Sequence, residues 1–198
     1  VADIIEYRLN TEQIINRVED VSMPTDYGDF QLIAFRSMDN PEPHLALCKG
    51  GIGEVDSFGK VAAQTDPVLV RVQPECLLGG AFKFGACRCG QAIDAAIRQI
   101  EKEGKGAFVL LRRFQGPRIE DAVNPCVRAA AAKDRLAPKP IGPNSERRDF
   151  GLGSQILQAL GLRKLRVMTN SNLKIYGLEG FGLSLVERVP LEIEERVT

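Results

Sequence analysis

The strongest constraint on this chain is a group of cysteines placed directly before an amphipathic helix. Three of the five cysteines, Cys76, Cys87 and Cys89, lie close together in the sequence. One residue separates Cys87 from Cys89, a spacing that is awkward for a structural disulfide but suits two thiolates on one metal ion. An odd number of cysteines also argues against a disulfide framework. The cluster predicts reduced, metal-binding thiols, two at the start of the helix and one after the preceding strand.

Zinc suits such a cluster, because it binds thiolate sulfur at about 2.3 Å in tetrahedral geometry. Three protein ligands leave a fourth position for water, whose pKa the metal lowers to about 7. Two other interpretations stay open. Either Cys48 or Cys126 supplies a fourth ligand and the metal only braces loops, or the thiols are inert. The only histidine, His44, lies in a strand pattern far from the cluster. We favour an open site of the catalytic type.

The periodicity of the rest of the chain predicts alternating strands and helices. Residues 90–103 carry apolar side chains on one face and charged ones on the other, which predicts an amphipathic helix. Strands are predicted at 30–35, 44–48, 68–72, 107–111 and 165–168, the first two as a pair. Further helices are predicted at 1–18 with a break near residue 10, at 154–160 with Gly161 as its C-cap, and from 173 to 179. A turn is predicted over 23–29, and an irregular, weakly packed segment over 116–145 with a helix at 128–135. This order is typical of mixed α/β or α+β layering.

Composition excludes two classes of partner. The chain has 26 Lys+Arg and 26 Asp+Glu residues, so its formal net charge is +0 and nothing favours binding to long nucleic acid. No run of about 18 apolar residues exists that would span a membrane. The chain begins at Val1 without a leader pattern. We therefore expect a piece of a longer protein that works in the cytoplasm, or in another reducing compartment if a targeting segment has been removed.

Several separated motifs together resemble one enzyme family. They are Pro24–Phe30, Val70–Leu77, Cys87–Gly90, Arg148–Leu157, Leu165–Asn170, Gly177–Leu183 and Val186–Leu191. The motifs occur in the order found in GTP cyclohydrolase II, and the resemblance runs from about residue 18 to residue 191, weakest between 112 and 145. Residues 4–8 also resemble the linker to a preceding synthase in two-domain riboflavin enzymes. The resemblance implies an α+β fold with a mixed β-sheet flanked by helices. It further implies a linker helix over 1–18 and one GTP cyclohydrolase II-like domain over 19–198.

The resemblance implies a defined reaction. Members of the family are hydrolases that open the imidazole ring of GTP, release C8 as formate and remove pyrophosphate, which gives a riboflavin precursor. Their zinc ligands correspond to Cys76, Cys87 and Cys89, and the water on that zinc would attack C8. The arginine proposed to take the α-phosphate corresponds to Arg148, and the proton acceptor to Glu146, where the family usually has Asp.

The resemblance also implies how the nucleotide is held. Its contacts carry over to Arg71, Glu75, Thr169 and Lys174, with Mg²⁺ on the triphosphate, and the expected assembly is a homodimer. Taken singly, Thr169 could cap a turn and Lys174 could be a solvated side chain, and Arg148 could form a surface ion pair with Asp149. Their joint appearance with the three cysteines favours a nucleotide site.

The chain departs from the family pattern at the site itself. The replacements are Gln73 and Pro74 for His and Ser, Arg88 for an acidic residue, Ala92 for a guanine-contacting glutamine, Gln115 for a carboxylate and Pro117 for a phosphate-binding arginine. A lost charged hydrogen bond to the triphosphate weakens binding by about 1.5–3 kcal/mol. We therefore expect an impaired or altered cyclohydrolase. The alternatives are a related hydrolase for another nucleotide and a non-catalytic domain that supports a fused synthase.

Overall fold

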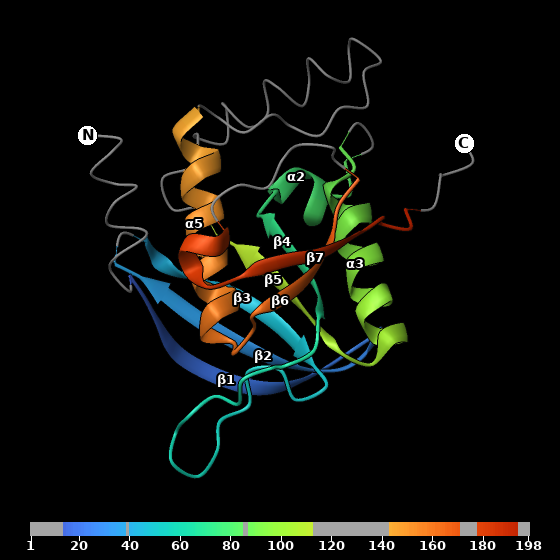
Figure 1. Cartoon of the computed structure of the whole chain (residues 1–198). Coiled ribbons are helices and arrows are strands. Elements are labelled where there is room, and N and C mark those ends of the chain that lie inside the picture. The colour runs from blue at the N-terminus through green and yellow to red at the C-terminus, as the bar shows by residue number, and fades with distance from the viewer. Residues whose placement is uncertain (1–13, 39, 85–86, 113–142, 171–177, 194–198) are drawn as a thin grey trace.

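The computed structural model describes residues 14–38, 40–84, 87–112, 143–170 and 178–193, and these build one seven-stranded mixed sheet with helices on both faces (Figure 1). The strand order is β1-β2-β3-β5-β4-β6-β7. The strands are β1 (Ile15–Thr25), β2 (Gly28–Ser37), β3 (Asn40–Lys49), β4 (Val68–Pro74), β5 (Gly106–Leu111), β6 (Lys164–Met168) and β7 (Ser184–Val189). The helices are α2 (Leu77–Gly80), α3 (Cys89–Glu103), α5 (Pro143–Ala159) and the short 3₁₀ helix η1 (Leu178–Phe181). The predicted α+β fold with a mixed sheet is confirmed.

The first three strands form an antiparallel meander. Val21 pairs with Leu32 across β1 and β2, and Leu32 pairs with Leu47 across β2 and β3. The predicted pairing of 30–35 with 44–48 is therefore confirmed. The predicted turn over 23–29 is shorter, because the two strands run on until Thr25 pairs with Gly28.

The predicted helix over 1–18 is wrong for its last residues, which begin β1. Residues 1–13 lie outside the described part of the chain. Ile15 is 1% exposed and pairs with Ser37, and the Ile14 N–H donates to Gln155 Oε1 at 3.1 Å. The apolar residues at 14, 15 and 18 fit either periodicity, and pairing with β2 decides for the strand.

The second half of the sheet is parallel. β4 pairs with β5 on one side and with β6 on the other, and β6 pairs with β7, all in parallel. The chain passes from β4 through α3 to β5, then returns past β4 to reach β6 after α5. In such sheets, ligands bind beyond the carboxyl ends of the strands where the direction of the connections reverses. The fold therefore favours a ligand site beyond the carboxyl ends of β4, β5 and β6.

The two long helices cover opposite faces of the sheet, as Figure 1 shows. The apolar face predicted for residues 90–103 is confirmed, since Ala92, Ala96, Ile97 and Ile100 of α3 are buried in one core cluster. That cluster also contains Leu69 of β4 and Phe108 of β5. The other core cluster contains Leu152, Ile156 and Leu157 of α5, together with Leu178 and Phe181 of η1.

Helix α5 begins earlier than the pattern predicts. The expected helix spans 154–160, whereas α5 starts at Pro143 and includes Gly151 and Gly153. Glycine usually weakens a helix, but a Cβ at Gly153 would lie 2.8 Å from Val72 Cγ1, so close packing on β4 requires glycine there. The predicted C-cap is confirmed, because Gly161 has φ +82 and its N–H donates to Gln158 O at 3.0 Å.

Two further predictions fall mainly outside the described residues. Of the segment expected to be irregular, 116–142 lies outside, and 143–145 belong to α5. Of the helix expected from 173 to 179, only the end is described, and it is the 3₁₀ helix η1. In the part of the chain that the structure describes, no helix has both the length and the apolar character needed to cross a membrane.

Candidate metal centre

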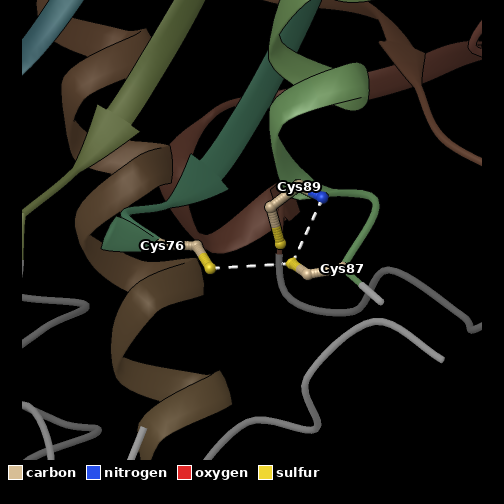
Figure 2. Close-up of side chains that lie close together, drawn as sticks. All are labelled: Cys76, Cys87 and Cys89. Carbon is tan, nitrogen blue, oxygen red and sulfur yellow. Dashed lines mark hydrogen bonds between the residues drawn. The ribbon is translucent and has the colours of Figure 1, made fainter. Parts of the chain in front are cut away.

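The three clustered cysteines meet at the carboxyl end of β4. Cys76 is the N-cap of α2, Cys87 lies in the turn before α3, and Cys89 is the first residue of α3. Their three sulfur atoms all lie within 4.8 Å of one another, and the Cys76 and Cys87 sulfurs are 3.7 Å apart. Figure 2 shows the three side chains pointing toward one another. The convergence predicted from the spacing is confirmed.

Backbone groups fix two of the sulfurs. The Gly79 N–H donates to Cys76 Sγ and the Cys89 N–H donates to Cys87 Sγ, each at 3.4 Å. These donors stabilise thiolate charge, because a sulfur anion accepts hydrogen bonds more strongly than a neutral thiol. The turn thus prepares the sulfurs as anionic ligands.

Two glycines allow the turn and the helix to come this close. A Cβ on Gly79 would lie 2.6 Å from Cys87 Sγ and 3.0 Å from Cys89 Cβ. A Cβ on Gly90 would lie 2.2 Å from the carbonyl oxygen of Gly79. A larger residue at Gly79 would force the thiols apart, and one at Gly90 would force the start of α3 away from the backbone of α2.

The protonation of the three thiols is linked. Hydrogen bonds from Cys87 and Cys89 hold the pKa of Cys76 far below its ordinary value. The hydrogen bond to Cys76 in turn raises the pKa of Cys87 and of Cys89, and burial adds to both shifts. Three thiolates this close repel one another unless a cation lies between them, so the donor set fits a soft divalent metal such as zinc.

No fourth ligand joins the trio within the described residues. Cys48 lies in the opposite core cluster, where burial raises the pKa of its thiol to about 12. His44 is 1% exposed on β3, and its Nδ1 accepts a hydrogen bond from the Arg112 N–H at 3.1 Å. Burial lowers the pKa of His44, and the Arg112 charge lowers it further. Cys126, the other possible fourth ligand, lies outside the described residues. The three described sulfurs leave a tetrahedral metal one further position.

Arg71 and Gln73 occupy the same face of β4 beside the thiols. The Arg71 Nη1 donates to the carbonyl oxygen of Met168 at 2.9 Å, and its Nη2 donates to Gln73 Oε1 at 3.2 Å. Gln73 Nε2 donates to the carbonyl oxygen of Cys89 at 3.1 Å. Burial lowers the pKa of Arg71, and the charge of Cys89 opposes that shift. Hydrogen bonds thus join β4, the start of α3 and the end of β6.

Glu75 lies at the same edge, between β4 and the end of β5. Its N–H donates to the carbonyl oxygen of Leu111 at 2.8 Å, and its carboxylate accepts from Arg112 Nε at 3.4 Å. Arg112 also forms an ion pair with Glu42 at 3.0 Å. The Arg112 guanidinium therefore has two carboxylate partners, Glu75 and Glu42.

The structure describes the other predicted site residues less fully. Thr169 directly follows β6, is half-buried, and its N–H donates to the carbonyl oxygen of Val189 at 2.8 Å. Glu146 and Arg148 belong to the first turns of α5, and their side chains are outside the described part. Lys174 lies outside the described residues altogether. The structure therefore brings the cysteines together and places Arg71, Glu75 and Thr169 near the carboxyl ends of β4 and β6, and their roles stay predictions, as do those of the remaining three.

Sequence reasoning missed the roles of Gln73 and Gly79. Gln73 entered only as a departure from a motif, although its position two residues after Arg71 places both on one face of a strand. Gly79 stands in a Gly-Gly pair between the cysteines, a signal that backbone must approach something closely there. Of the other departures, Gln115 and Pro117 lie outside the described residues.

Comparison with known proteins shows one family over nearly the whole chain. The family model described as GTP cyclohydrolase II matches residues 16–190. The chain is 37% identical over 198 residues to the riboflavin biosynthesis protein RibBA of Chlorobium phaeovibrioides, covering 98% of this chain and 45% of that protein. It is 39% identical over 194 residues to RibBA of Porphyromonas gingivalis, covering 97% and 45%. It is 38% identical over 195 residues to RibBA of Bacillus cereus, covering 98% and 47%. The chain thus spans about half the length of these curated relatives.

A solved structure shares the fold. It is the crystal structure of RibBX, a two-domain 3,4-dihydroxy-2-butanone 4-phosphate synthase from A. baumannii. The TM-score is 0.63 with 23% sequence identity, over 95% of this chain and 44% of that one. At this identity the likeness supports the architecture alone.

Proposed function

The chain belongs to the GTP cyclohydrolase II family, and from that premise we propose that it is a zinc-dependent cyclohydrolase that opens the imidazole ring of GTP with release of formate and pyrophosphate. The observation that carries the proposal is the meeting of three cysteine sulfurs within 4.8 Å of one another at the carboxyl end of β4. A merely structural zinc site normally closes with four protein ligands. An open three-sulfur centre suits hydrolysis instead.

Cys76, Cys87 and Cys89 would hold the zinc. Bound there, zinc supplies a water with lowered pKa and polarises the bond under attack. Arg71, Glu75, Thr169 and Lys174 would bind the nucleotide, with Mg²⁺ on its triphosphate. Placement of Arg71, Glu75 and Thr169 along one edge of the sheet supports this assignment.

Two residues of α5 would act on the reacting groups. In this proposal an Arg148 nitrogen bonds to the α-phosphorus as the bond to pyrophosphate breaks, and Glu146, two residues earlier on the same helix, accepts the proton that the guanidinium loses. Water then cleaves the phosphorus–nitrogen bond and frees the enzyme. Support comes from the position of both residues in the first turns of α5, whose later turns pack against the sheet whose strand β4 ends just before Cys76.

The domain arrangement is a further part of the proposal. We propose one GTP cyclohydrolase II-like domain preceded by a linker and joined to a synthase in a longer, cytoplasmic, homodimeric protein. Support comes from relatives about twice as long as this chain and from the two-domain synthase that shares the fold. The role in riboflavin biosynthesis is taken from the names of those relatives.

A second candidate has its own support. Ala92, which replaces a guanine-contacting glutamine, is 7% exposed and packs in the apolar cluster under α3. Its methyl group offers no hydrogen bond to a base. A related hydrolase acting on another nucleotide is therefore the alternative.

One experiment tests both candidates. The purified protein is incubated with zinc, magnesium and either GTP or other nucleotides, while formate, pyrophosphate and ring absorbance are measured. We expect formate release from GTP, at about one zinc per chain. Cys87→Ser should lose the zinc and the turnover, because too few soft ligands remain. The matched control is Cys48→Ala, which removes a buried thiol outside the centre.

The outcomes separate the candidates. Turnover of a different nucleotide in place of GTP selects the alternative substrate. Zinc bound by four protein ligands, or turnover that survives Cys87→Ser, contradicts the open centre.

A further inference from the structure

Gln73 connects the metal centre to the neighbouring cation. Its side chain is 4% exposed, and both ends of its amide are used. The oxygen accepts from Arg71 at 3.2 Å from Nη2 and 3.4 Å from Nε, while the nitrogen donates to the Cys89 carbonyl oxygen at 3.1 Å. The amide of Gln73 is uncharged, so it can orient the Arg71 side chain without changing the net charge of the site.

We propose that Gln73 is a positioning residue that fixes the Arg71 guanidinium beside Cys89, where its positive charge offsets the excess negative charge of the loaded metal centre. The inference deepens the proposed function, because it rests on the three cysteines holding a divalent metal.

Formal charges give the reason that a cation is needed. Three thiolates and one divalent metal ion carry a net charge of −1, and one guanidinium brings the sum to zero. An uncompensated charge in a partly buried site is destabilising, so neutrality stabilises the loaded centre. Thiolates also donate electron density, and a nearby cation counteracts the loss of metal acidity that follows.

Arg71 is suited to this role because no acidic side chain neutralises it within the described part of the chain. Its acceptors are the Met168 carbonyl oxygen and the Gln73 amide oxygen, both neutral. Its positive charge interacts favourably with Cys89. By contrast, Arg112 at the same edge forms ion pairs with Glu42 and Glu75, so its charge is already compensated.

Glutamine is the side chain that the geometry requires at this position. The amide oxygen accepts from Arg71, and the amide nitrogen donates to the Cys89 carbonyl oxygen. A carboxylate would accept from Arg71 but repel the carbonyl oxygen and cancel the cation. An apolar side chain of the same length would remove the hydrogen bonds to both groups.

The test measures metal binding directly. Cobalt is used as the probe, since its thiolate-to-metal absorption bands report ligand geometry, and zinc affinity follows by competition. Gln73→Met keeps the volume and removes the three hydrogen bonds of the amide. We expect it to weaken metal binding about 10-fold or more, as is usual when a group supporting a ligand is removed, and to shift the cobalt bands. Gln73→Glu should weaken binding at least as much, because it removes the donor and neutralises Arg71.

Gln99 provides the matched control on the same helix as Cys89. Its Nε2 donates to the Pro190 carbonyl oxygen at 3.0 Å and its Oε1 accepts from the Glu192 N–H at 3.3 Å. Gln99→Met therefore removes the same kind of bridge away from the thiols. It should lower stability without changing cobalt affinity or the cobalt spectrum.

The results distinguish the two levels of proposal. A wild-type protein that binds no cobalt overturns the proposed function, and this inference with it. A wild-type protein that binds cobalt, with Gln73→Met folded and unchanged in affinity and spectrum, overturns the inference alone. If Gln73→Met does not fold, Gln73→Glu decides in the same way, and wild-type binding by that variant overturns the inference.

Discussion

At the scale of single residues, one missing methyl group at Gly79 lets the three thiols meet. A Cβ there would lie 2.6 Å from Cys87 Sγ, whereas a Cβ on the neighbouring Gly80 would meet only Ile93 Cδ1 at an ordinary 3.7 Å. The two adjacent glycines therefore differ in purpose. Gly79 is required for the close approach of the thiols, and Gly80 has room for a side chain.

That contrast gives a prediction with an internal control. Gly79→Ala should displace Cys87 and weaken zinc binding about 10-fold or more, measured by competition with a chromophoric chelator. Gly80→Ala should bind zinc like the parent. Equal affinities for the two variants would show that the close approach at Gly79 has no bearing on the metal.

Cys48 allows a second prediction at this scale. Burial raises its pKa to about 12, so at pH 8 only about one thiol in ten thousand is ionised, and thiolate is the reactive form. Iodoacetamide at pH 8 should leave Cys48 unmodified in the folded protein while it modifies the metal-free cluster, and zinc should protect the cluster. Peptide mass spectrometry reads each site, and rapid labelling of Cys48 in folded protein would contradict its burial.

At the scale of secondary structure, the packing of α5 on β4 decides where that helix can lie. Gly153 faces Val72, and an added Cβ would lie 2.8 Å from Val72 Cγ1. Two effects oppose each other in Gly153→Ala. Alanine stabilises a helix interior by about 1 kcal/mol relative to glycine, whereas overpacking costs about 1–3 kcal/mol.

We predict that the cost of overpacking exceeds the gain in helix propensity. Gly153→Ala should lower the free energy of unfolding by about 1–2 kcal/mol, measured in urea with the denaturant slope unchanged. Adding Val72→Ala removes the opposing methyl groups, so the double variant should be more stable than the sum of the single effects. A Gly153→Ala protein more stable than its parent would mean that propensity prevails and that the helix is free to shift.

At the scale of the whole molecule, the sheet sets where the domain begins. The resemblance places the domain at 19–198, but β1 starts at Ile15 and the Ile14 N–H donates to Gln155 on α5. Residues 14–18 thus connect the first strand to a helix from the far end of the chain. We propose that they belong to the domain and not to the linker.

Two truncations test this boundary. Removal of residues 1–18 deletes the buried Ile15 and should lower the melting temperature by about 4–8 °C or more relative to removal of residues 1–13, since losing a core side chain costs about 2–5 kcal/mol. Identical melting temperatures would restore the boundary at residue 19.

The sequence by itself determined the local elements and the chemistry available to them. The amphipathic stretch at 90–103, the apolar strands at 68–72 and 107–111, and the thiol spacing are all local patterns, and α3, β4, β5 and the cysteine group follow them. The order of the motifs also sufficed for the family. The helix and strands depend on residues within about one or two turns of each other, so periodicity reveals them, whereas the cysteine spacing and the motif order are read directly along the sequence.

Only the tertiary structure decided which distant groups meet. Gln73 lies beside the start of α3 because two parallel crossovers bring the ends of β4, β5 and β6 to one edge, and no local pattern encodes that juxtaposition. The same holds for Ile15, whose apolar side chain suits a helix or a strand until β2 pairs with it. It holds also for Gly153, where contact with Val72 outweighs helix propensity. In each case the deciding free energy comes from contacts between segments far apart in the chain, which a local reading of the sequence does not contain.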